Sequence, residues 1–337
     1  MTGKHPRHDD AGATGIAPRR LLGALAVAAL VAFAVSLGVG PSGFGLGGSG
    51  EAASLILWEI RLPRAVLGAL VGAALGLAGA ALQGYLRNPL AEPSLVGVSG
   101  GAALGAVLAI HTGLVQAVAL ALPLGGLAGA AVAMLAVVAL AGAHGGPVTL
   151  ILAGLAVSGI ATALISLALN LSQNPFAAVE MVLWLMGSLA DRSLTQVWLA
   201  APPILAGMGV LLLLGRALDA LSLGEDAARS LGVDVARTRL AVVAGTALAV
   251  GAATSVTGVI GFVGLLVPHV LRPFAGHRPS LLLPASALTG AIFLLAADIA
   301  LRLAQPWMDL RIGVLTALIG APFFVWLVLK TRAELAP

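Results

Sequence analysis

The chain has 337 residues, of which 59% are hydrophobic and only 9% are charged, and its formal net charge is +4. A soluble protein of this length exposes a large surface to water, which its 18 basic and 14 acidic side chains cannot cover. The composition therefore excludes a soluble globular protein and predicts an integral membrane protein.

The same composition favours a helical membrane protein over a β-barrel. The 44 glycines suit helices that pack closely in lipid, whereas the short alternating segments of a β-barrel are absent. The basic residues lie in short stretches between apolar runs, which indicates a positive-inside bias rather than nucleic-acid binding. The chain has no cysteine, so disulfides and thiolate metal sites are excluded.

The first apolar run follows a polar N-terminus. Residues 1–18 match no motif and are predicted to form a disordered cytoplasmic tail, and Arg19 and Arg20 then precede an uncharged run over 21–40. A signal peptide has an apolar region of about 7–15 residues, so the longer run favours a retained helix. We therefore predict one transmembrane domain over residues 19–332.

Nine further apolar runs follow, giving ten candidate spans. They cover residues 65–82, 95–110, 115–141, 148–169, 197–214, 239–256, 259–271, 281–300 and 312–329. The runs 95–110 and 259–271 are too short to cross a core of about 30 Å alone, so we expect broken, tilted or buried helices there. The stretch 174–193 contains Pro175, Glu180 and Asp191 and predicts a short interfacial or re-entrant helix.

The distribution of charge predicts the orientation. If the N-terminus lies in the cytoplasm and the spans alternate, thirteen of the 18 Lys and Arg residues fall inside and five fall outside. This bias predicts that both termini are cytoplasmic. The five outer residues are Arg61, Arg64, Arg192, Arg302 and Arg311.

The energy source is predicted to lie outside this chain if it is an active transporter. No charged side chain falls in the middle of a predicted span, which disfavours the buried carboxylates and histidines of ion-coupled carriers. The chain also lacks a G-x-x-x-x-G-K-[ST] phosphate loop. An ion-coupled secondary transporter nevertheless stays open as the alternative function.

A hydrophilic stretch over residues 216–239 has two interpretations. Gly224 and Gly232 bracket a segment, Glu225 to Leu231, that is able to form two helical turns, with acidic residues first and Arg229 last, as a helix dipole favours. The segment could be a solvated connector. It could also be a helix that docks into a soluble partner, with Ala227, Ala228 and Leu231 as its apolar face.

A second irregular stretch, from Asn88 to Pro93, breaks the helical pattern. Pro89 and Pro93 lack an N–H and disfavour helical geometry in the residue before them. Irregular backbone at membrane depth must line a cavity or pack inside protein. A simple turn between two helices is the alternative.

Five motifs together resemble one known family. They are RLPR (61–64), QGYLRNPLAEPSLVGVSGGAALGA (83–106), LSLGEDAARSLGV (221–233), GFVGLLVPHVLR (261–272) and DLRIGVLTALIGAPFFVWLVLK (309–330). In this order they resemble FecCD-type permeases, the membrane subunits of ATP-driven importers for iron-siderophore, haem and cobalamin complexes. The resemblance covers the chain from about residue 58 to the end.

The resemblance implies an all-α, cobalamin-importer-like permease of the type II importer fold, with about ten transmembrane helices, in the bacterial inner membrane. It implies a second permease subunit, expected to form a homodimer, two ATP-binding subunits that use ATP and Mg, and a periplasmic or lipid-anchored substrate-binding protein. The chain itself is expected to be no enzyme and to bind no cofactor, metal or nucleic acid. Which chelate it carries is not indicated.

The resemblance also assigns roles to residues. Contacts with the ATP-binding subunit fall to Gly224, Glu225, Asp226, Ala227, Ala228, Arg229, Leu231 and Gly232. Docking of the binding protein falls to Arg61, Arg64 and Arg302, and the cytoplasmic gate to Asn88 and Leu90. For Arg302 the alternative is an i,i+4 ion pair with Asp298.

Three further features have plainer interpretations. A second constriction is implied before the fifth span, where Gly145-Gly146-Pro147-Val148-Thr149 shows no matching polar gate residue. His269 is expected to pack or cap rather than to bind metal. The spacing Gly68-Gly72-Gly76 predicts a helix-packing face rather than a ligand loop.

Overall fold

A computed structural model describes residues 17–335 apart from 41–42, 46–50, 143–144 and 277. The predicted tail over 1–18 therefore lies almost wholly outside the described residues. In chain order the described elements begin with α1 (Pro18–Gly38), the paired strands β1 (Val39–Gly40) and β2 (Gly43–Phe44), α2 (Glu51–Leu55), the π-helical turn η1 (Ile56–Arg61), α3 (Leu62–Leu86), the 3-10 turn η2 (Pro93–Val96), α4 (Val98–His111), α5 (Leu114–Ala117) and α6 (Ala121–Ala141). The remaining elements are α7 (Pro147–Asn170), α8 (Pro175–Leu185), α9 (Leu194–Leu213), α10 (Gly215–Leu221), α11 (Glu225–Ser230), α12 (Val235–Thr257), α13 (Val263–Leu271), α14 (Pro279–Ala304) and α15 (Ile312–Leu335).

Eight helical segments in the described part of the chain are long and apolar enough to cross a membrane. They are Pro18–Gly38, Glu51–Leu86, Ala121–Ala141, Pro147–Asn170, Leu194–Leu213, Val235–Thr257, Pro279–Ala304 and Ile312–Lys330. The two runs expected to be too short form the shorter helices α4 and α13. The predicted all-α bundle of about ten helices is confirmed, and so is the short helix α8 within 174–193.

Prolines mark where many of these helices begin. Pro18, Pro63, Pro147, Pro175 and Pro279 each lie in the first turn of their helix. Proline is tolerated there because the first N–H groups of a helix have no partner within the helix and the ring presets a helical φ. The position of these prolines is consistent with the observed helix starts.

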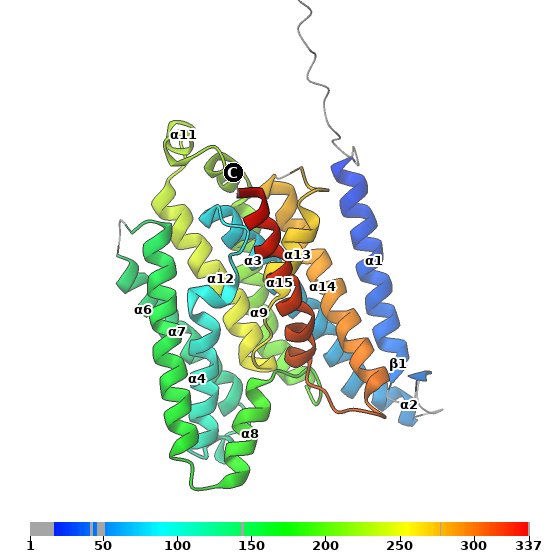
Figure 1. Cartoon of the computed structure of the whole chain (residues 1–337). Helices are drawn as coiled ribbons and strands as arrows, with labels where there is room; N and C mark the ends of the chain where they lie inside the picture. The colour runs from blue at the N-terminus through cyan, green and yellow to red at the C-terminus, as the bar shows by residue number, and fades with distance from the viewer. Residues whose placement is uncertain (1–16, 41–42, 46–50, 143–144, 277, 336–337) are drawn as a thin grey trace, which may run out of the picture.

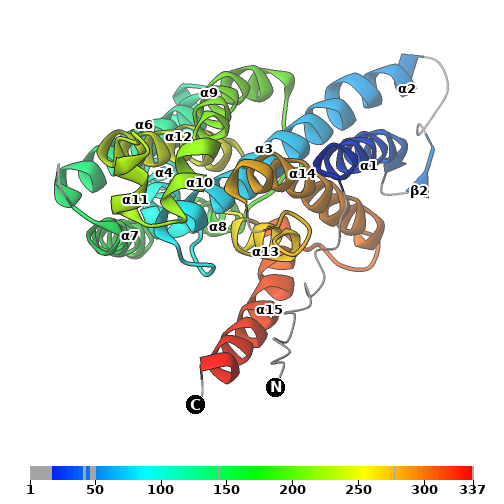
Figure 2. The same ribbon diagram turned by 90° about the horizontal axis from the view of Figure 1, so that it is seen from above.

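Helix α3 is the centre of the bundle and packs against α14, α12, α13 and α9 (Figure 2). Its contact with α14 depends on glycine, because a Cβ at Gly72 would lie 2.3 Å from the carbonyl oxygen of Gly290, and one at Gly76 2.3 Å from that of Ser286. Helices α4 and α6 meet in the same way, with 2.0 Å between a Cβ at Gly105 and the oxygen of Gly125. The predicted glycine packing face is confirmed.

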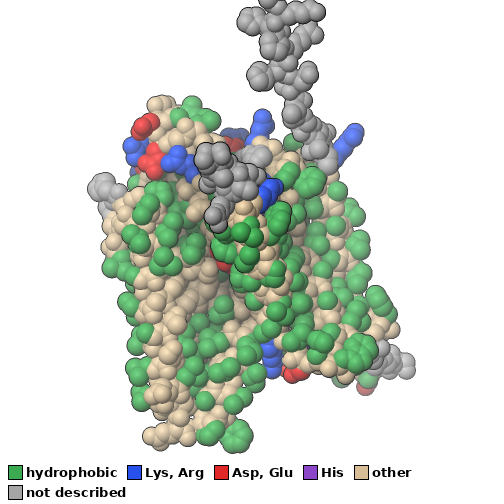
Figure 3. Space-filling view, in the orientation of Figure 1, with side chains coloured by type: hydrophobic (Ala, Val, Ile, Leu, Met, Phe, Trp, Pro, Cys, Tyr) green, Lys and Arg blue, Asp and Glu red, His purple; other side chains and the backbone are tan. Residues whose placement is uncertain are grey.

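The bundle has two polar ends, which we name by the short helix at each (Figure 1). The α11 end also holds the start of α1 and the C-terminal end of α15, whereas the α8 end holds α2 and strand β1. In the space-filling view, charged side chains gather at these two ends, and the surface between them is free of them except for one small acidic patch (Figure 3). This is the distribution expected of a protein that spans a bilayer.

Candidate functional site

The hydrophilic stretch at the α11 end contains the predicted short helix. Helix α11 covers Glu225–Ser230, preceded by Gly224 with φ of +110° and followed by Gly232 with φ of +84°. Both angles lie in the region that side chains with a Cβ rarely adopt, so glycine allows the chain to enter and leave a helix of six residues. Arg229 pairs with Glu225, with 3.2 Å between nitrogen and oxygen.

Some apolar residues in and beside α11 are buried in this chain, and others are exposed. Ala228 is fully buried in this chain, whereas Leu231 is 66% exposed and Leu223, just before the helix, is 70% exposed. Ala228 packs inward within this chain, so Leu231 is the most exposed residue of the predicted apolar face, and its contact with a partner stays a prediction. Two leucines at an end of the bundle rich in charge are left available for another protein.

The predicted break after α3 is confirmed. Arg87 ends the helix with φ of +49°, and the Oδ1 atom of Asn88 accepts a hydrogen bond from the Leu90 N–H with 2.9 Å between oxygen and nitrogen. Asn88 and Leu90 are both half-buried. The Asn88 side chain thus shapes the turn that carries Leu90, and the gate role of both residues stays a prediction.

Buried Gln83 satisfies the irregular backbone around this break. Its Nε2 atom donates to the carbonyl oxygens of Ala91 and Gly264, each at 3.2 Å, and its Oε1 atom accepts from Arg272 at 2.6 Å. The Glu92 carboxylate accepts the N–H of Phe262, which precedes α13. Non-helical backbone at this depth is stable because side chains from both sides complete its hydrogen bonds.

The backbone at the second predicted constriction is held by an arginine from another helix. Gly145 and Gly146 precede α7, and the Arg239 guanidinium of α12 donates to the carbonyl oxygen of Gly142 at 2.7 Å and to that of Gly145. Sequence reasoning missed this contact because 94 positions separate Arg239 from Gly145. The arginine ties α12 to the exit of α6.

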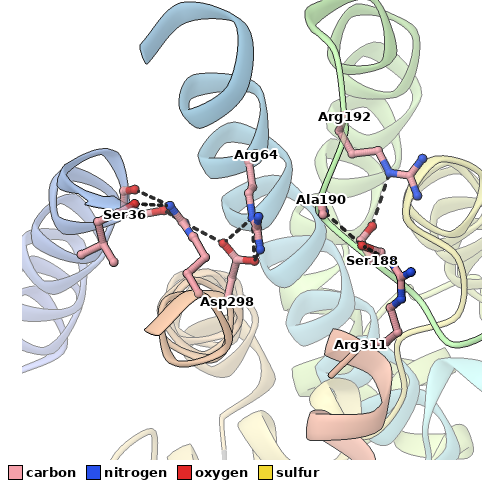
Figure 4. Close-up of polar contacts among 9 residues, drawn as sticks. Ser36, Arg64, Ser188, Ala190, Arg192, Asp298 and Arg311 are labelled. Atoms are coloured by element: carbon pink, nitrogen blue, oxygen red, sulfur yellow. Dashed lines mark hydrogen bonds and ion pairs between the residues drawn. The ribbon is translucent and has the colours of Figure 1, made fainter. Parts of the chain in front are cut away.

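Three of the arginines predicted to lie outside, Arg61, Arg64 and Arg302, form one network at the α8 end, and Figure 4 shows the part of it around Asp298. Asp298 on α14 accepts from the Arg64 Nε and NH2 atoms at 3.0 and 2.8 Å, and from the Arg302 NH2 atom at 2.6 Å. Arg302 also donates to the Ser36 carbonyl oxygen at 2.7 Å, and Arg61 donates to that of Leu37 at 2.9 Å. The network joins α3 and α14 to the last turn of α1.

The network leaves little of these arginine side chains exposed. Arg302 is 2% exposed and Arg61 is 6% exposed, while the Arg64 side chain keeps 17% of its surface. The i,i+4 pair of Arg302 with Asp298 is confirmed. The carbonyls at the end of α1 carry partial negative charge, which favours the guanidinium groups placed against them. The docking role of the three arginines stays a prediction.

The described residues show no metal centre. No group of three or more His, Asp or Glu side chains among them is placed to hold a metal ion. The ring of His269 packs edge-on against Phe323 of α15, with ring centroids 5.5 Å apart, as expected for a packing residue.

In the described part of the chain, long apolar helices lie between two polar ends (Figure 3), and this arrangement defines a polytopic helical membrane protein. The FecCD transport family profile matches residues 21–330, and the chain belongs to that family. This confirms the resemblance inferred from the five motifs.

Curated relatives and a solved structure agree with this assignment. The chain is 44% identical to the cobalamin import system permease protein BtuC of Halobacterium salinarum, over 82% of this chain and 74% of the relative. It is 39% identical to the vitamin B12 import system permease protein BtuC of Citrobacter koseri, over 93% and 95%. An ABC transporter described as of the metal-chelate type, in an inward-facing conformation, superposes with a TM-score of 0.84 at 33% identity, over 93% of this chain and 99% of that one.

Proposed function

We propose that this chain is the permease subunit of a binding-protein-dependent, ATP-driven importer of cobalamin or of an iron chelate in the bacterial inner membrane. The observation that carries the proposal is the similarity to a vitamin B12 permease over 93% of this chain and 95% of the relative. Family membership disfavours the ion-coupled secondary transporter. The chain would form the pathway, and a separate subunit would hydrolyse ATP and supply the energy.

The proposed assembly places a partner at each end. A second copy of the chain completes the pathway, two ATP-binding subunits contact Leu223, Leu231 and α11, and a substrate-binding protein docks at the α8 end. Two of the three predicted docking arginines pair with Asp298. Of these two, Arg64 has the more exposed side chain, 17% against 3% for Arg302. We expect Arg64 to contribute most of the direct contact, because a guanidinium can bind a carboxylate with two hydrogen bonds.

Transport by the reconstituted assembly tests the proposed function. The chain would be placed in proteoliposomes with the ATP-binding subunit and binding protein encoded beside it, and uptake of cobalamin and of ferric siderophores would be measured with and without ATP. We expect ATP-dependent uptake of one of these cargoes. Uptake that follows an ion gradient without ATP would instead support the secondary transporter.

Association with the ATP-binding subunit tests the coupling site. Leu231→Glu adds a charge to the exposed apolar position, and we expect recovery of the co-purified ATP-binding subunit to fall about tenfold or more, as for a buried interface residue. Thr195→Glu, at an exposed position near the α8 end, is the matched control and should leave recovery unchanged. Equal recovery with both variants would place the contact elsewhere.

The orientation can be measured directly because the chain has no cysteine of its own. We expect Ala236→Cys, exposed near the α11 end, to be labelled by an impermeant maleimide only after the cytoplasmic side is opened. Thr195→Cys should be labelled from the outside in intact spheroplasts. The reverse pattern would overturn the proposed cytoplasmic location of both termini.

A further inference from the structure

A cavity of about 400 Å³ at the α8 end lies beside the buried arginine network, since Arg311 also lines a second pocket with Arg64 and Asp298. We call it the arginine cavity, and it is bounded by α8, by the turn before α9 and by Arg311 just before α15. One wall is apolar and includes Phe176, Leu183 and Trp184, with Phe176 85% exposed. Arg192 and Arg311 provide the positive charge.

The two guanidinium groups converge on the same residue from different elements (Figure 4). The Nε atom of Arg192 donates to the Ser188 carbonyl oxygen at 3.4 Å, and the NH1 atom of Arg311 donates to the Ser188 Oγ atom at 3.5 Å. Both contacts are long and therefore weak. Each guanidinium has five N–H donors, so most of the donors of both groups remain unused.

Neither arginine forms an ion pair within the part of the chain that the structure describes. No described carboxylate oxygen lies within 4.0 Å of either guanidinium, in contrast to Arg64 and Arg302, which share Asp298. Glu180 and Asp191 also line the cavity, but both are exposed residues. The cavity thus has two converging cations, with its two acidic residues open to solvent.

The electrostatic environment of Arg192 combines burial with a neighbouring positive charge. Burial lowers the pKa of its guanidinium, the Asp191 charge raises that pKa in part, and the positive charge of Arg311 lowers it again. Two like charges held together in a partly buried site are stabilised by an anion between them. A carboxylate or phosphate has oxygens in the geometry that guanidinium groups bind with two hydrogen bonds.

We propose that the arginine cavity binds the anionic oxygens of a cargo molecule whose body is apolar. The carboxylate or phosphate would lie between Arg192 and Arg311, and the apolar body would rest on Phe176, Leu183 and Trp184. This inference rests on the proposed import function, because it makes the cavity a first contact for cargo at the α8 end. The cavity would select cargo that carries negative charge, a selection that the apolar helices of the bundle do not make.

A pair of porphyrin probes, one with free carboxylates and one with these carboxylates esterified, tests the cavity. Ferric protoporphyrin IX carries two carboxylates on a flat apolar ring, and its dimethyl ester has the same ring without the charges. Both would be titrated by absorbance against the full-length chain in nanodiscs, with empty nanodiscs subtracted. We expect the diacid to bind about tenfold or more tighter than the diester, since one bidentate ion contact contributes about a factor of ten or more.

Substitution of the arginines should remove this preference. Arg192→Gln with Arg311→Gln should weaken diacid binding about tenfold or more and leave diester binding unchanged, while Arg→Lys at both positions should keep part of the preference. Arg87→Gln is the matched control. Arg87 is exposed and follows the C-terminal end of α3, away from the cavity, so this change should affect neither titration. Retention of the ATP-binding subunit by each variant would show that it is folded.

The outcomes separate this inference from the proposed function. Equal binding of acid and ester, no saturable binding of the diacid, or an unchanged double variant would each overturn the arginine cavity, even if ATP-driven uptake is observed. Charge-selective binding that the double variant loses would support the cavity. If that selectivity came without ATP-driven uptake of any cargo, it would count against the importer and leave the cavity as an anion site.

Discussion

Asp298→Asn is expected to destabilise the protein by about 3–5 kcal/mol, because it leaves the buried guanidinium of Arg302 and the partly buried one of Arg64 without their shared counter-charge. Asp298 is 1% exposed and holds both Arg64 and Arg302. We would measure the fraction of chain that stays monodisperse in detergent after heating. The midpoint of that curve should fall by several degrees.

Two further variants make this expectation specific. Asp309→Asn removes a carboxylate at the same end of the bundle, but Asp309 is exposed, so the midpoint should not move. Arg302→Met leaves the Arg64 pair with Asp298 in place and should cost less than Asp298→Asn. A midpoint that responds equally to all three changes would show that the network does not hold α1, α3 and α14 together.

The network also shows where prediction from the sequence stops. The motif RLPR and the pair Asp298 and Arg302 are visible in the sequence, and the i,i+4 spacing correctly predicted their ion pair. The contact between Arg64 and Asp298 spans 234 positions and depends on how α3 packs against α14. No local pattern encodes that contact, so the burial of Arg61 and Arg302 could not be predicted from the sequence, and the docking role of the three arginines stays a prediction.

Local rules succeeded where backbone chemistry decides the structure. Pro89 and Pro93 predicted the break after α3, and the lengths of the runs 95–110 and 259–271 predicted the shorter helices α4 and α13. The side chain that satisfies the break, Gln83, was not identified, because its partners Ala91 and Gly264 are brought together only by the fold. Arg239 of α12 was not identified for the same reason, because its partner Gly142 follows α6 and is brought close only by the fold.

The arginine cavity is likewise formed by tertiary structure and not by a local sequence pattern. Arg192 and Arg311 were both recognised as outer basic residues, but their convergence on Ser188 joins positions 123 apart and requires α15 to start beside the turn after α8. Charge counting assigns a residue to a side of the membrane. Tertiary structure then decides whether the charge is neutralised within the chain, as at Arg302, or is left for a ligand, as we propose for Arg311.

Gly290→Ala and Gly209→Ala are the same chemical change and are expected to have opposite effects on stability. A Cβ at Gly290 would lie 2.1 Å from the carbonyl oxygen of Gly72, and backbone cannot move aside without separating α14 from α3. We expect a loss of about 1–3 kcal/mol or more from overpacking. Gly209 lies within α9 with nothing within 4 Å of its added Cβ, so alanine there should stabilise the helix by about 0.5–1 kcal/mol.

Comparing Gly290→Ala with Gly209→Ala separates the effect of close helix packing from that of helix propensity, since both glycines lie inside long helices. Heating curves in detergent would be recorded for each variant and for Gly72→Ala, which meets the same contact from the side of α3. Because the bilayer offers no hydrophobic drive for association of α3 with α14, their contact must come from the closeness that glycine permits. Stabilisation by alanine at Gly290 would mean that the two helices hold together by some other interaction.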